Sequence, residues 1–155
     1  MTILIDTDVL VDVALDRLPF AAAAGALLDA LERRPNSGFV AWHTVSNFYY
    51  LVAAARGRKA SLDFLLDLTR FVRVAPATTQ AMRYAATLPM GDFEDAMQVA
   101  AAEACAADAI ATRNTRDYKA SPIRAARPEM LVVELERRDW RPTPESPGPP
   151  GRSRR

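Results

Sequence analysis

The chain has 155 residues, half of them hydrophobic and a quarter charged, which is an ordinary balance for one globular domain with a proper core. Its 20 Lys and Arg nearly match its 19 Asp and Glu, and residues 141–155 contribute four Arg and only one Glu. The remaining 16 basic and 18 acidic side chains exclude binding to nucleic acid through bulk charge alone. A single cysteine excludes an internal disulfide framework, and no apolar run is long enough to span a membrane, so we expect a cytoplasmic protein.

Taken in chain order, the hydrophobic pattern alternates between strands and helices. Strands are predicted at residues 2–5, 39–42, 71–74, 109–112 and 131–133. Helices are predicted at residues 9–15, 21–31, 44–55, 61–69, 78–87 and 92–107, with Gly57 ending the third of them. This alternation predicts an α/β fold with a central, mostly parallel sheet of four to five strands and helices on both faces. Residues 141–155 are rich in Pro, Gly, Ser and Arg and are expected to be a disordered tail after a folded domain at 1–140.

The segment Asp6-Thr7-Asp8 directly follows the first predicted strand. A carboxylate at this point lies at the edge of a sheet, with its side chain free for chemistry. The alternative is that the segment caps the helix that follows, because Asp and Thr favour the N-cap position. The segment alone leaves both interpretations open.

A second acidic segment opens the helix predicted at 92–107. Asp92 and Asp95 are three residues apart, so they share one face of that helix, and Gln98 extends the face. The alternative is that Asp92 is the N-cap, while Glu94 and Asp95 offset the helix macrodipole in the first turn.

A third polar segment, at residues 112–118, follows the strand predicted at 109–112. Asn114 and Asp117 carry oxygen atoms that could bind a metal ion, and Arg113 and Arg116 are suited to phosphate oxygens. Thr, Asn and Asp are also common turn residues, so the alternative is a solvated loop.

Two of these segments follow predicted strands and the third begins a predicted helix, and these positions together favour a functional site. In open parallel sheets, sites form in the crevice beyond the carboxyl ends of the strands. Oxygen ligands of this kind suit Mg²⁺ or Mn²⁺, which can activate water and neutralise a phosphodiester. We therefore expect Asp6 to be one of several carboxylates that gather to hold a divalent metal ion.

Four segments, taken in order, resemble the motifs of the PIN-domain ribonucleases found as toxins in prokaryotic VapBC-type pairs. They are Leu4-Ile5-Asp6-Thr7-Asp8-Val9-Leu10, Thr44-Val45-Ser46-Asn47-Phe48-Tyr49-Tyr50, Asp92-Phe93-Glu94-Asp95-Ala96 and Thr112-Arg113-Asn114-Thr115-Arg116-Asp117-Tyr118. Each motif is short, but four in the correct order make the match fairly specific, and the resemblance covers roughly residues 2–135. It implies a three-layer α/β/α domain that is an Mg²⁺- or Mn²⁺-dependent endoribonuclease.

The resemblance also implies roles for individual residues. Asp6, Asp95 and Asp117 would form the metal pocket, with Asp92 assisting on the same helical face as Asp95. These three acids and Asn47 would be the catalytic residues. Contacts to substrate would come from Thr7, Arg113, Asn114 and Arg116.

One position departs from the family's usual pattern, because Asn47 stands where most members have Glu. An amide offers a cation only a neutral carbonyl oxygen, so the pocket is expected to bind the ion more weakly, with Asp92 compensating. A subgroup with an Asp-Phe-Glu-Asp-Ala run resembles this chain in carrying Asn there.

The resemblance implies partners as well: an RNA substrate, a cognate antitoxin whose segment lies across the acidic pocket, and a second copy of the chain in a homodimer. It gives no catalytic role to His43, the only histidine. The apolar residues around Phe48 and Phe64 have helical spacing, which favours core or dimer packing over a platform for stacking bases.

Two other functions stay open at this point. The first is a phosphatase of the haloacid dehalogenase type, in which Asp6 would be a covalent nucleophile and Lys59 would be the lysine that precedes the second acidic segment. The second is a non-catalytic PIN-like module that binds RNA or protein, and Asn47 is the reason to keep it.

Overall fold

The computed structural model describes residues 1–139, so the predicted boundary after residue 140 and the predicted tail at 141–155 lie outside the described residues. The strands of the described part are β1 (Ile3–Ile5), β2 (Gly38–Val40), β3 (Val72–Val74), β4 (Ala109–Ala111) and β5 (Ala125–Ala126). Its helices are α1 (Thr7–Ala14), α2 (Ala21–Glu32), α3 (Trp42–Arg56), α4 (Arg58–Leu68), α5 (Thr79–Ala85), α6 (Phe93–Ala104) and α7 (Pro128–Asp139).

The five strands form one sheet in the order β3-β2-β1-β4-β5, and every neighbouring pair is parallel. β1 is the central strand, and its residues Ile3, Leu4 and Ile5 are all completely buried. A strand buried on both faces must be apolar throughout, which is why the run before Asp6 contains no polar residue. The predicted parallel α/β sheet is therefore confirmed.

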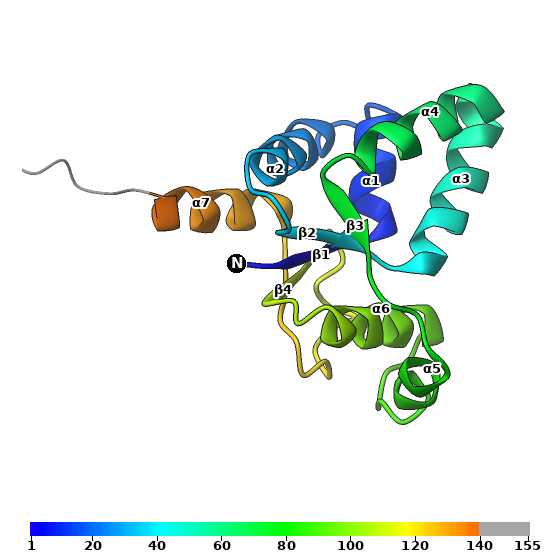
Figure 1. The fold of residues 1–155 in the computed structure, drawn as a ribbon, viewed down its shortest axis with the longest axis vertical. Helices are drawn as coiled ribbons and strands as arrows, with labels where there is room; N and C mark the ends of the chain where they lie inside the picture. The colour runs from blue at the N-terminus through cyan, green and yellow to red at the C-terminus, as the bar shows by residue number, and fades with distance from the viewer. Residues whose placement is uncertain (140–155) are drawn as a thin grey trace, which may run out of the picture.

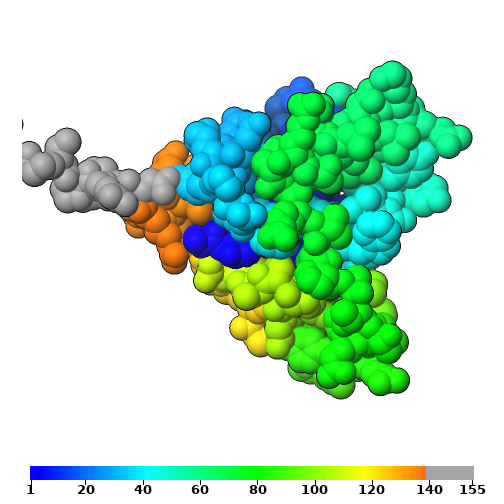
Figure 2. Space-filling model, viewed as in Figure 1, coloured from blue at the N-terminus to red at the C-terminus, as the bar shows by residue number. Residues whose placement is uncertain are grey.

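Helices cover both faces of this sheet, giving the three-layer arrangement that was predicted (Figure 1). Successive side chains of a strand point to opposite faces. Accordingly, Ile3 and Ile5 pack with α1, α2, α3, α4 and α7, while Leu4 packs against α6. In the space-filling view the α3–α4 pair and α5 occupy two corners of the described part, and α7 lies toward a third (Figure 2).

Gly57 separates α3 from α4 and has a positive φ of 87°, a conformation that side chains with a Cβ rarely adopt. The two helices fold back on each other there, and the rings of Phe48 and Phe64 stack at 4.8 Å between centroids. Phe48 is completely buried. Core packing is thus the role of this pair, as its helical spacing predicted.

The strand predicted at 131–133 is wrong, because these residues lie inside α7. Leu131 and Leu135 are buried one helical turn apart, whereas Val133 is exposed. Pro128 favours the first turn of a helix, and charged residues surround the short apolar run. The fifth strand is instead Ala125–Ala126, whose two residues are too few to produce a recognisable pattern.

None of the helices within residues 1–139 has the length and apolar character needed to cross a membrane.

The helical placement of Leu131 can be tested by two substitutions. Leu131→Ala is expected to lower the free energy of unfolding by about 2–5 kcal/mol, because it leaves a cavity in the core. Val133→Ala is expected to cost under about 1 kcal/mol, since Val133 is 43% exposed. In a strand the two side chains would share one face, so equal losses in urea denaturation would contradict the helix.

Candidate metal-binding cleft

A cleft of about 650 Å³ opens beyond the carboxyl ends of β1 and β4, between α3 and the start of α6. We call it the carboxylate cleft, because six acidic side chains line it: Asp6, Asp8, Asp92, Glu94, Asp95 and Asp117. The other polar side chains that line it are Thr7, Arg17, Asn47, Arg113 and Asn114. Every site residue predicted from the sequence is among these, except Arg116, which is exposed on the loop after β4.

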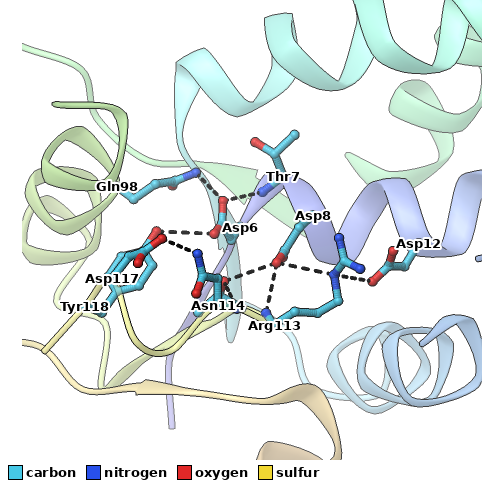
Figure 3. Close-up of polar contacts among 10 residues, drawn as sticks. Asp6, Thr7, Asp8, Asp12, Gln98, Arg113, Asn114, Asp117 and Tyr118 are labelled. Carbon is cyan, nitrogen blue, oxygen red and sulfur yellow. Dashed lines mark hydrogen bonds and ion pairs between the residues drawn. The ribbon is translucent and has the colours of Figure 1, made fainter. Parts of the chain in front are cut away.

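Asp6 is both a helix cap and a carboxylate of the cleft, so the two interpretations of its segment hold together. It is the N-cap of α1, and its Oδ1 accepts a hydrogen bond of 2.6 Å from the backbone N–H of Thr7. The same Oδ1 accepts 2.9 Å from Gln98 Nε2, and Oδ2 accepts 3.2 Å from the hydroxyl of Tyr118 (Figure 3). Asp6 therefore caps α1 and lines the floor of the cleft at the same time, and the capping hydrogen bond holds its carboxylate there.

The acidic groups of the cleft repel one another. Burial, followed by the neighbouring charge of Asp8, raises the pKa of Asp6 from 3.8 to about 7. Burial also raises the pKa of Asp95, with the charges of Asp92 and Asp117 adding to the effect. A cation in the cleft would relieve this repulsion and favour the ionised carboxylates.

Gln98 holds Asp6 in place from α6. Its side chain is completely buried, and Nε2 donates to Asp6 Oδ1 and, at 2.8 Å, to the hydroxyl of Thr44 on α3. The Thr7 hydroxyl lies 3.4 Å from that of Thr44 and donates to it. Thr7 is thus a buried part of this support that also lines the cleft, and its contact with substrate stays a prediction.

Arg113 is turned away from open solvent by two acids of α1. Its backbone N–H donates 2.9 Å to Asp8 Oδ2, and its Nε lies 3.0 Å from Asp12 Oδ2 (Figure 3). Its guanidinium also lies 4.5 Å over the ring of Phe20. Asp12 is completely buried, so this pairing offsets a carboxylate that would otherwise be costly to bury.

Asp92 is the N-cap of α6, with Oδ1 accepting 2.7 Å from the backbone N–H of Glu94, as the capping alternative expected. Asn47 Nδ2 donates 2.5 Å to Glu94 Oε1, which joins α3 to α6 across the cleft. On the loop after β4, Asn114 Nδ2 donates to Asp117 Oδ2.

The chemistry of these donors fits a hard divalent cation, since the cleft offers carboxylate and amide oxygens and neither cysteine nor histidine. Buried oxygens of Asp8 (Oδ1) and Gln98 (Oε1) have no hydrogen-bond partner within the described residues. Yet no three acidic, His or Cys side chains between residues 1 and 139 lie close enough together to hold an ion as they stand. All six acidic side chains nevertheless line the same cleft.

Several residues of the cleft were not singled out from the sequence. Glu94 was interpreted only as a first-turn acid, although the same motif contains Asp92 and Asp95. Arg17 lies in the segment between α1 and α2, where nothing in the sequence marks it. Tyr118, which is buried beside the cleft, was not singled out either, because its hydrogen bond to Asp6 joins residues 112 positions apart.

Two other polar residues lie away from the cleft. His43 is half-buried, and burial lowers its pKa. Lys59 is exposed on α4 and pairs with Asp63 at 2.6 Å, so it is not placed to assist Asp6 in the way that the phosphatase alternative needs.

Comparison with known proteins agrees with this fold. The chain is similar to VapC20 of Mycobacterium tuberculosis, described as a sarcin-ricin loop cleaving toxin, with a TM-score of 0.62, 17% identity, and coverage of 79% of this chain and 96% of that chain. It is also similar to a chain of VapBC2 from Rickettsia felis bound to a promoter DNA fragment (TM-score 0.63, 14% identity, 82% and 98% coverage). A chain of FitAB bound to the IR36 DNA fragment gives a TM-score of 0.59 at 20% identity, with 83% and 96% coverage.

A search of curated proteins finds no significant match. The family model for the PIN domain, in contrast, matches residues 2–116, well over half of the chain. The match runs from β1 through the end of β4 and so includes every carboxylate of the cleft except Asp117. The chain therefore belongs to the PIN domain family.

Proposed function

We propose that this protein is an Mg²⁺- or Mn²⁺-dependent endoribonuclease and the toxin of a toxin–antitoxin pair. The observation that carries the proposal is the carboxylate cleft, in which six acids from the start of α1, the start of α6 and the loop after β4 line one cavity. Asp6, Asp95 and Asp117 would hold the ion, with Asp92 and Asn114 assisting. When bound there, such an ion lowers the pKa of water and neutralises charge on a phosphodiester.

The chain's own residues would position the substrate. The phosphate contact that the sequence suggested for Arg113 suits it poorly, because Asp8 and Asp12 already engage its guanidinium. Arg17 is exposed and lines the cleft, so we assign it this role together with Arg116 on the loop after β4. Both lie at the surface, where an RNA backbone can reach them.

The partners follow from the fold and from exposed apolar residues. The folds of VapBC2 and FitAB support a cognate antitoxin as the binding partner. Tyr50, Leu51, Leu62 and Leu66 on α3 and α4 are exposed, which favours a homodimer through this helical pair. We propose the cytoplasm as the place where the protein meets these partners.

The nuclease activity is tested with a labelled RNA and the full-length chain in Mg²⁺ or Mn²⁺. Asp6→Ala is expected to reduce cleavage by about 100-fold or more, because the central carboxylate of the site is lost. Asp63→Ala is the matched control, since Asp63 is an exposed acid on α4 outside the cleft. Equal cleavage by wild type and Asp6→Ala would show that the activity comes from elsewhere, and RNA binding without cleavage would favour the non-catalytic module.

The repulsion between Asp6 and Asp8 gives a second test, which needs no substrate. In metal-free buffer at pH 7, Asp6→Asn is expected to stabilise the protein by about 1–2 kcal/mol, or roughly 2–8 °C in Tm. The amide keeps an acceptor for Thr7 and Gln98 and removes a buried charge. Added Mn²⁺ is expected to raise the Tm of the wild type but not that of the variant. A variant that is less stable than the wild type without metal would contradict the electrostatic description of Asp6.

A further inference from the structure

Glu94 is the acid of the carboxylate cleft that reaches toward α3. It lies in the first turn of α6, next to Asp95 in sequence, and successive residues of a helix point about 100° apart. Asp95 lies beside Tyr118, on the side of the cleft where Asp6 emerges from β1. Glu94 instead accepts the 2.5 Å hydrogen bond from Asn47 Nδ2 on α3. The two neighbouring acids therefore serve different sides of the cleft.

The α3 side of the cleft has no carboxylate of its own. The α3 residues that line it are Asn47, Tyr50 and Leu51. The amide nitrogen of Asn47 points at Glu94, and an N–H donor repels a cation rather than binding it. The carboxylate that contacts α3 here is that of Glu94 on α6.

Asn47 also fixes how Glu94 is presented. A hydrogen bond to a carboxylate is stronger than one between neutral groups, and this one uses only Oε1. The second oxygen, Oε2, is left for another partner. Asp92 Oδ1 accepts from the backbone N–H of Glu94, so Asp92 bonds within the start of α6, whereas Glu94 bonds to α3.

We propose that Glu94 is the ligand on the α3 side of the metal ion and that Asn47 is a positioning residue which holds the Glu94 carboxylate toward it. The inference rests on the proposed metal-dependent function and adds a ligand to it. It changes the expected role of Asn47, which would act through Glu94 and would not bind the ion itself.

Calorimetry of Mn²⁺ binding to the full-length chain tests this without measuring activity. Glu94→Gln keeps the size of the side chain, and it is expected to weaken Mn²⁺ binding by about 10-fold or more. Glu103→Gln is the matched control, because Glu103 is an exposed acid on the same helix and does not line the cleft. Its Mn²⁺ affinity is expected to equal that of the wild type.

An exchange of the two side chains sharpens the test. Asn47→Glu in the Glu94→Gln background moves the carboxylate from α6 to α3, and it is expected to restore affinity to within about 3-fold of the wild type. Asn47→Ala keeps Glu94 but removes its support, so a smaller loss of about 3-fold is expected. Circular dichroism and thermal melting check that each variant is folded.

The outcomes separate this inference from the function on which it rests. If the wild type binds Mn²⁺ and Glu94→Gln binds it equally well, Glu94 is not a ligand while the proposed function stands. If the exchange restores nothing, the two side chains do not serve the same side of the ion, and the inference fails. If the wild type does not bind Mn²⁺ at millimolar concentration, both the inference and the metal-dependent function fail.

Discussion

The hydrogen bonds of one buried amide hold the cleft together. Gln98 on α6 donates to Asp6 after β1 and to Thr44 on α3, so one side chain ties the central strand to a helix on each face of the sheet. Its complete burial makes these bonds stronger and their loss more costly than at the surface. The position of the Asp6 carboxylate, and with it the floor of the cleft, depends on this junction.

The acidic side chains around Asp6 repel one another, which lowers the stability of the fold when no cation is bound. Burial and the charge of Asp8 raise the pKa of Asp6 to about 7, and burial raises that of Asp95 as well. Proteins keep such repulsive groups at sites where activity needs them, at a cost in stability. Arg113 offsets Asp8 and Asp12 at one edge of the cleft, which leaves Asp6, the acids of α6 and Asp117 as the groups that a cation would neutralise.

The sequence predicted the structure correctly where a short stretch of residues determines the local conformation. The apolar run of β1 predicted a buried strand, and the order of Asp6, Asn47, Asp95 and Asp117 predicted residues that line one cleft. The strand predicted at 131–133 failed because three apolar residues have no distinguishable period, and the one-turn spacing of Leu131 and Leu135 became clear only in the fold. The contacts of Arg113 with Asp12 and of Asn47 with Glu94 join distant segments, so no local pattern reveals them.

The most direct test of the metal site is a crystal structure of the full-length protein soaked in Mn²⁺, with anomalous diffraction to locate the ion. The account expects a peak inside the carboxylate cleft, at about 2.0–2.4 Å from oxygens of Asp6 and Asp95. A cleft without a peak at millimolar Mn²⁺, or an ion bound only at other positions, would contradict the claim that these carboxylates form a metal site.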